Sequence, residues 1–178
     1  MSRPSLPGSS GVPPAIFGLV LAAIFVLPAF AIKFAPLSIE RLRDIAQVIV
    51  HGTVREKICE RDPEGRIYTR VTLDLHETWK GSASGRTFTF VQGGGTLGEQ
   101  TVEVSGQENF EIGEEVVLFL VLNKRSEGVV IGLSQGKFKV RHDPSDGRTY
   151  VHNLFHGNRP GSAIMLDALK QRVKGDAK

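Results

Sequence analysis

The sequence predicts a mainly β protein, a small barrel of about six to eight short strands with a short N-terminal helix and a C-terminal helix. Three observations support this class. Short apolar and β-branched segments alternate with Gly-, Pro- and Asp-rich turns along most of the chain. The segment Ile67–Trp79 alternates apolar and polar residues, interrupted only at Glu77, and strands that long usually coil and serve both halves of a barrel. Helical spacing of apolar residues occurs only near the two ends of the folded part.

The first elements form a helix and a hairpin. Ser38–Arg43 begins a helix with Ser38 as its N-cap. Ala46–Val54 is β-branched and mostly apolar, which predicts a strand buried on most of both faces. The turn signal Asp62–Gly65 separates this strand from Ile67–Trp79, whose apolar residues predict one face on a core. We therefore expect the two strands to pair in an antiparallel hairpin.

Shorter strands follow, and a helix ends the chain. A loop is expected over residues 93–98, and Asp143–Gly147 is typical of a hairpin turn. The helix is expected over Ser162–Val173 with Ser162 as N-cap. The remaining strands or extended segments are expected at Arg86–Gln92, Gln100–Val104, Val116–Leu122, Val129–Leu133, Gly136–Arg141 and Arg148–His152.

Residues 1–31 have the pattern of a secretory signal peptide. A polar region with Arg3 precedes thirteen apolar residues, Ala15–Leu27, and Ala29 and Ala31 supply the small residues of a cleavage site. We therefore divide the chain into a signal peptide (1–31), a linker (32–37) and a single domain (38–178). The expected protein is exported, periplasmic or secreted, with no stable membrane span after cleavage. The alternative is a membrane anchor formed by an uncleaved N-terminal helix, because residues 15–32 carry no charge.

Two segments are candidate ligand-binding sites. Residues 124–178 carry 11 basic and 5 acidic side chains. Alternation places Lys137, Lys139 and Arg141 on one strand face, with Arg148 on the next strand, so this face predicts binding of an anionic glycan, a lipid or an acidic protein. Export argues against nucleic acid as the normal ligand, and a solvated strand face is the alternative interpretation.

The second candidate is the loop Gly93-Gly94-Gly95. Glycines let a backbone approach a ligand closely, and binding residues concentrate on loops held by a rigid scaffold. The alternative interpretation of these glycines is a tightly turned or mobile loop.

No catalytic or metal site is predicted, and no cofactor. His152 and His156 are four residues apart, which suits a metal only on a helix, and the neighbouring Asn153, Gly157 and Pro160 oppose a helix. A metal-dependent hydrolase using these histidines with Asp143 or Asp146 is therefore kept only as an alternative. Cys59 is the only cysteine, so no intrachain disulfide is expected, and its acidic neighbours disfavour a reactive thiolate.

Several segments together resemble a family of uncharacterised bacterial exported proteins. The resemblance covers about residues 40–141 and implies an OB-like barrel, similar in shape to the netrin-like domain of metalloproteinase inhibitors. Those inhibitors use an amino-terminal cysteine and a disulfide frame, which this chain lacks, so none of their inhibitory residues carries over. The segments are residues 44–54 (DIAQVIVHGTV), 68–69, 72–73, 78–81 (TWKG), 92–94 (QGG), 113–120 (GEEVVLFL) and 135–140 (QGKFKV).

The expected function is that of an exported, non-enzymatic binding module whose partner is an exported protein or another envelope component. One alternative is an inhibitor or accessory partner of an exported protease, which rests on the resemblance in fold.

Overall fold

The computed structural model describes residues 35–83, 85–156 and 162–175. The predicted signal peptide, with its cleavage residues Ala29 and Ala31, lies outside the described residues, and so does the first half of the predicted linker. Within the described part of the chain, no helix is both long enough and apolar enough to cross a lipid bilayer.

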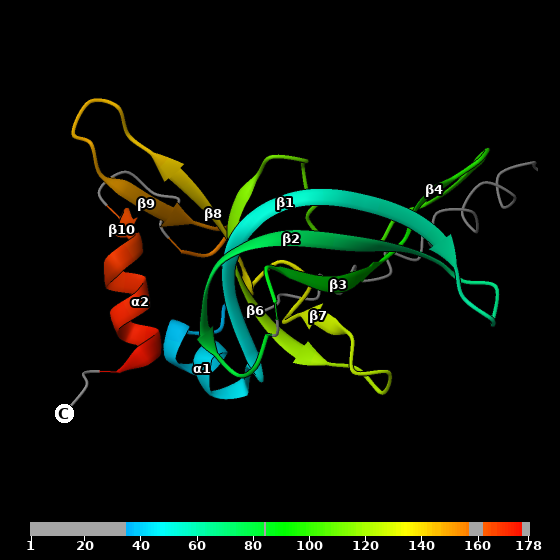
Figure 1. The fold of residues 1–178 in the computed structure, drawn as a ribbon, viewed down its shortest axis with the longest axis horizontal. Coiled ribbons are helices and arrows are strands. Elements are labelled where there is room, and N and C mark those ends of the chain that lie inside the picture. Colours follow the sequence, from blue (N-terminus) through cyan, green and yellow to red (C-terminus); the bar gives the residue numbers. More distant parts are fainter. Residues whose placement is uncertain (1–34, 84, 157–161, 176–178) are drawn as a thin grey trace, which may run out of the picture. The chain divides into compact units, whose positions relative to one another are not determined.

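Five strands close into a barrel (Figure 1). They are β1 (Val48–Arg61), β2 (Ile67–Lys80), β3 (Thr87–Gly93), β7 (Gly128–Val130) and β6 (Glu115–Leu122), in that spatial order. Antiparallel pairing of β1 with β6 closes the ring over six residue pairs. On the opposite side, β3 and β7 run parallel and meet only at Phe90 and Gly128. The predicted class, a mainly β barrel with a helix near each end of the described chain, is confirmed.

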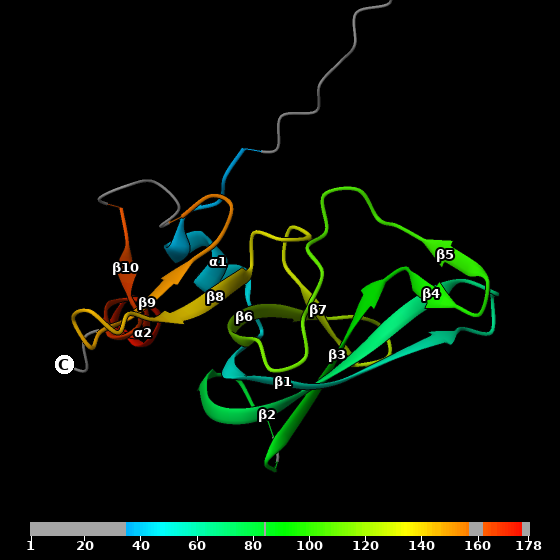
Figure 2. The ribbon, with the colours of Figure 1, turned by 90° about the horizontal axis from the view of Figure 1, so that it is seen from above.

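The remaining elements extend this barrel (Figure 2). Strands β8 (Lys137–His142), β9 (Thr149–His152) and β10 (Ile164–Met165) continue the sheet from β6. Strands β4 (Gly95–Leu97) and β5 (Gln100–Val102) form a separate two-stranded sheet near the far end of the β1–β2 hairpin. The helices are α1 (Ile39–Ile45) and α2 (Leu166–Lys174).

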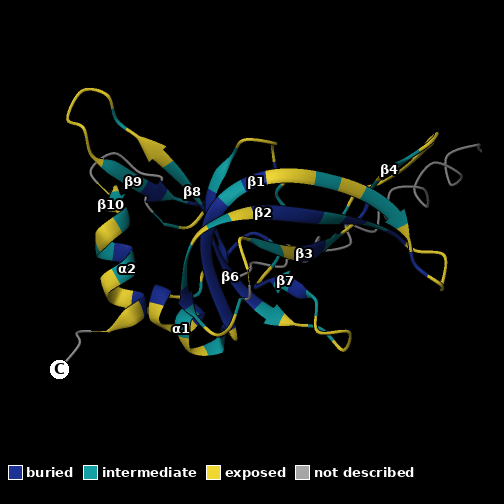
Figure 3. Cartoon of the chain, in the orientation of Figure 1, coloured by how far each residue is buried: buried dark blue, intermediate teal, exposed yellow. Residues whose placement is uncertain are grey.

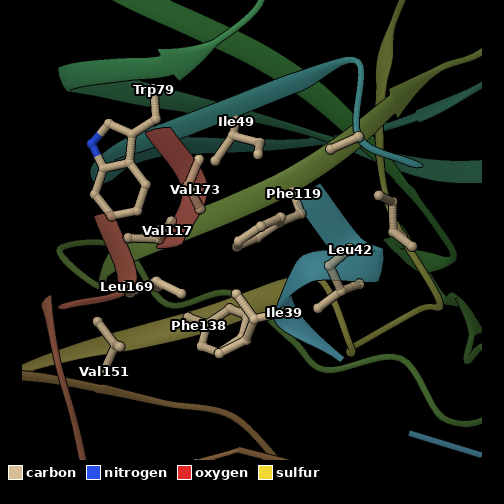
Figure 4. Packing of buried hydrophobic residues seen from close by; sticks show 12 residues of the cluster. Ile39, Leu42, Ile49, Trp79, Val117, Phe119, Phe138, Val151, Leu169 and Val173 are labelled. Atoms are coloured by element: carbon tan, nitrogen blue, oxygen red, sulfur yellow. The ribbon is translucent and has the colours of Figure 1, made fainter. Parts of the chain in front are cut away.

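Strand β6 separates two apolar cores, because its alternate side chains point to opposite faces. Val116, Leu118 and Leu120 pack inside the barrel with apolar residues of β1, β2, β3 and β7. Val117 and Phe119 pack on the outer face, under α1, α2 and the β8–β9 hairpin. Both faces are consequently buried at the centre of the sheet (Figure 3). Figure 4 shows the outer core, where Phe119 and Phe138 lie with ring centroids 5.5 Å apart.

The predicted hairpin of the first two strands is confirmed, but neither strand keeps the same face toward one core along its whole length. Their pairing shifts register at three places, between Ile49 and Val50, between His51 and Gly52, and between Val54 and Glu56. Such bulges turn the strand and re-aim its side chains. As a result Leu73 packs inside the barrel and Trp79 in the outer core, although the sequence predicts a single face for both.

Both predicted helices form, and the second begins later than expected. Ser38 caps α1 by accepting a hydrogen bond from the Arg41 amide at 3.1 Å. The expected N-cap Ser162 is wrong, because Ile164 and Met165 pair with Val151 and Tyr150 as strand β10. The helix therefore begins only at Leu166.

Candidate functional site

A groove of about 830 Å³ lies beside the tip of the β1–β2 hairpin. Its walls come from the β1–β2 turn, the start of β2, the end of β3, strand β5 and the β6–β7 turn. We call it the hairpin groove. The groove is defined by six of its lining residues, Arg66, Tyr68, Gln92, Val102, Val104 and Arg125.

Close backbone packing shapes this groove, and it explains the glycines predicted as a binding loop. Gly94 has a φ of 74°, and a Cβ there would overlap the carbonyl oxygen of Val102. At Gly95, a Cβ would overlap the hydroxyl of Thr69 and lie 2.7 Å from the sulfur of Cys59. Only glycine fits both positions without a shift of the neighbouring strands. Gly93 and Gly94 line the hairpin groove, so this candidate segment does border a ligand-sized space.

A second hollow of about 510 Å³ shares part of that wall. Gly93, Gly95, Gln92 and Cys59 line it, and the thiol of Cys59 is partly buried there. The glycine segment thus lies between two hollows and contributes to both.

The hairpin groove combines apolar walls with cationic side chains. Arg61, Arg66 and Arg125 line it. Arg66 pairs with Asp62 at 2.7 Å and with Glu64 at 2.9 Å, and Arg125 pairs with Glu127 at 3.0 Å. The Arg125 guanidinium lies 5.9 Å from the centre of the Tyr68 ring. An occupant with apolar groups and negative charge would therefore complement these walls.

One polar atom on the groove wall has no partner. The side-chain oxygen of Gln92 is buried, and no hydrogen bond to it occurs among the described residues. A buried acceptor without a donor is unfavourable by about 1–3 kcal/mol. A ligand N–H placed beside Gln92 would satisfy this oxygen.

The predicted basic stripe does not face solvent at Lys137. Its side chain is 1% exposed, and its ammonium donates to the Asn109 carbonyl at 2.6 Å and to the Glu114 carboxylate at 2.9 Å. The nitrogen also lies 4.1 Å from the centre of the Phe110 ring. The alternation along β8 is as predicted, but the segment before β6 covers this face, so Lys137 is part of the interior and not of a binding surface.

Burial and pairing act in opposite directions on this pair. Burial lowers the pKa of Lys137, and the hydrogen bond and charge of Glu114 only partly offset it. Burial alone would raise the pKa of Glu114, but the hydrogen bond and charge of Lys137 hold it below its usual value.

The other members of the stripe have partners of their own. Lys139 lies 3.4 Å from Glu114 and 3.6 Å from Glu108. Arg141 donates to the imidazole of His152 at 3.3 Å. Arg148 lies at the hairpin turn, where its amide donates to Asp146. The structure therefore does not assemble Lys137, Lys139, Arg141 and Arg148 into one exposed cationic face.

The histidines of the alternative hydrolase site are held apart. His156 contacts the carbonyl of Leu37 at 2.8 Å and stacks on Phe138, whereas His152 lies in β9 beside Arg141. Among the described residues, neither belongs to a group of three or more side chains that could hold a metal ion.

A different group of titratable residues does come together, and no local pattern in the sequence indicates it. His51 on β1, His76 on β2 and Glu115 on β6 place their ligating atoms within 4.8 Å of one another. They lie far apart in the chain, and the pairing of β1 with both β2 and β6 brings them together. Burial lowers the pKa of His51, although the Glu115 carboxylate opposes this shift.

The sequence matches no protein-family model, and no curated protein matches it significantly.

Proposed function

We propose that this protein is an exported, non-enzymatic binding module that holds an extended segment of a partner protein in the hairpin groove. The position of the groove carries the proposal. Small five-stranded barrels of the OB type bind oligonucleotides and oligosaccharides on the face of strands 2 and 3, between the loops that follow the first and fourth strands. In this barrel the corresponding elements are β2, β3, the β1–β2 turn and the β6–β7 turn, and all four line the groove.

The strand order supports the OB-like part of this proposal. The ring β1-β2-β3-β7-β6 is antiparallel except for the pair β3–β7. That arrangement fits the barrel that the sequence resemblance implies.

The groove chemistry favours a peptide-like occupant that carries acidic residues. Val102 and Val104 offer apolar contact, and the arginines of the two turns supply positive charge. The unpaired oxygen of Gln92 can accept a hydrogen bond from an N–H group, and every peptide bond other than that of proline has one. An anionic glycan or lipid would satisfy the arginines but would supply fewer such donors.

The experiment is site-specific photo-cross-linking in the native host. A photoreactive amino acid replaces Val102, an exposed groove residue, and in a matched strain it replaces Ile112, an exposed apolar residue outside the groove. We expect a specific cross-linked protein from position 102 and none from position 112. A partner that is a protease would make inhibition the next assay.

Charge reversal of the groove provides the second arm. Arg125→Glu should abolish the cross-link at position 102, since it inverts the charge beside Tyr68. Cross-linking to lipid or glycan alone, or equal products from both positions, would contradict a peptide-binding groove.

A further inference from the structure

A partly buried carboxylate at the rim of the outer core is surrounded by imidazoles. Glu115 is 19% exposed in its side chain, and its oxygens lie 2.7 Å from His51 Nε2, 3.6 Å from His76 Nδ1 and 2.7 Å from His142 Nε2. Among the described residues, every ion-pair partner of Glu115 is a histidine. None of these four residues lines the hairpin groove.

The neighbouring glutamate shows how different this arrangement is. Glu114, which directly precedes the strand, pairs with the ammonium groups of Lys137 and Lys139. In the part of the chain that the structure describes, neither lysine nor arginine pairs with Glu115, and its ion-pair partners are groups that also ligate transition metals. A carboxylate that serves only as a structural anchor is more simply paired with lysine or arginine.

The outer imidazoles are oriented by hydroxyl groups. Thr53 Oγ1 contacts Nε2 of His76 at 3.1 Å, which leaves Nδ1 toward Glu115. Thr149 Oγ1 contacts Nδ1 of His142 at 3.0 Å, which leaves Nε2 toward Glu115. Holding one ring nitrogen so that the other is presented is how proteins fix metal-ligating histidines.

The distances suit a small divalent ion. In a tetrahedral zinc centre with bonds of about 2.0–2.1 Å, neighbouring ligand atoms lie about 3.3 Å apart. The contacts of Glu115 with His51 and His76, at 2.7 and 3.6 Å, bracket that spacing. His51 is held between two paired strands, whereas His76 and His142 are more exposed and leave a path for an ion from solvent.

We infer that His51, His76 and Glu115, whose ligating atoms lie within 4.8 Å of one another, bind one zinc-type divalent cation. The exposed His142 contacts the other oxygen of Glu115 and would turn toward the ion as the fourth ligand. Two or three imidazoles with one carboxylate select zinc and its first-row neighbours, whereas magnesium and calcium prefer oxygen ligands alone. The ion would join β1, β2, β6 and β8 at one point.

The test uses the untagged protein as its host produces it, freed of metal by a chelator and titrated with Co²⁺ as an optical probe. We expect one Co²⁺ per chain with the visible bands of tetrahedral coordination, displacement by an equivalent of Zn²⁺, and no displacement by excess Mg²⁺. His76→Asn should weaken Co²⁺ binding at least tenfold. The control His152→Asn, which changes a histidine outside the cluster, should change it less than twofold.

Circular dichroism establishes that each variant is folded, and His142→Asn supplies a second variant at a still more exposed position. We expect His142→Asn to weaken binding and to alter the Co²⁺ spectrum. Absence of saturable binding to the wild type, or wild-type affinity in His76→Asn, would overturn the site. An unchanged spectrum in His142→Asn would overturn the role of that residue as fourth ligand.

Discussion

Replacing Lys137 by methionine tests whether the buried ion pair, rather than apolar packing alone, holds β8 against the segment before β6. The substitution removes the ammonium from the carboxylate of Glu114, the carbonyl of Asn109 and the face of Phe110 while keeping most of the side-chain volume. Glu114 is then left as a largely buried carboxylate.

Removing one partner of a buried ion pair costs about 3–5 kcal/mol of unfolding free energy. We expect about 3 kcal/mol, the lower end, because Lys139 remains 3.4 Å from Glu114. For a chain of this size that loss lowers the thermal midpoint by roughly 10 °C. Lys139→Met is the matched control, since Lys139 is partly exposed, and it should cost less than about 1 kcal/mol.

The unfolding free energy lost in Lys137→Met should decrease as the pH falls. Lys137 holds the folded-state pKa of Glu114 below its usual value, so the stabilisation is present above the unfolded pKa and is lost as pH falls through the folded pKa. In Lys137→Met the protonated Glu114 no longer needs a cation. The difference between wild type and variant should therefore shrink as pH falls, from the raised pKa that burial gives Glu114 in the variant to its lowered pKa in the wild type.

Urea unfolding followed by fluorescence at pH 7 and pH 3.5 measures both quantities. The double variant Lys137→Met/Glu114→Gln should recover about half of the loss, since no unpaired charge remains. If Lys137→Met costs no more than Lys139→Met, or if its deficit is as large at pH 3.5 as at pH 7, the assigned role of the pair is wrong.

Three further predictions concern α2, the groove wall and the outer core. Glu77 binds two lysines of α2 and the Trp79 indole, and these contacts lower its pKa to about 2. Glu77→Gln should therefore lower the unfolding free energy at pH 7 by about 1 kcal/mol after solvent screening. In thermal melts this loss should fade as the pH falls toward 2. Gly65→Ala should lower the unfolding free energy by about 1 kcal/mol, because Gly65 has a positive φ and nothing near its Cβ position. Gly94→Ala should cost about twice that or more, because the new Cβ would also overlap a carbonyl oxygen of β5. Equal losses in urea unfolding would contradict the groove geometry. Leu169→Ala should lower the unfolding free energy by about 2–5 kcal/mol, because it opens a cavity in the outer core. The control Leu154→Ala, at an exposed position, should cost less than about 0.5 kcal/mol. Similar melting points for the two variants would argue against packing of α2 on the outer core.

Local patterns in the sequence were sufficient for the barrel strands and for the Ser38 cap. The apolar run of β6 and the turn at Asp62–Gly65 each specify their element from neighbouring residues, so the class of the fold follows from them. The start of α2 was missed because Ser162 resembles an N-cap, while the pairing of Ile164 with Val151 depends on a strand elsewhere in the chain.

The candidate sites needed tertiary structure. Alternation along β8 places Lys137 opposite Phe138, but no local pattern shows that the residues around Phe110 cover the lysine. His51, His76 and Glu115 meet only because register shifts in the β1–β2 pair and the closing pair β1–β6 align them. Neither event has a signature in the spacing of these residues.

The two seams that close the barrel differ in length, so the shorter seam should separate more readily than the longer one. Six residue pairs join β1 to β6, whereas a single pair, Phe90 with Gly128, joins β3 to β7. Amide protons bonded across the β3–β7 seam should therefore exchange with solvent through its local separation, well before those between β1 and β6 exchange by global unfolding. Val91 and Val129, on the two sides of this seam, also line the hairpin groove. The side of the barrel that opens most readily therefore lies beside the site proposed for the partner.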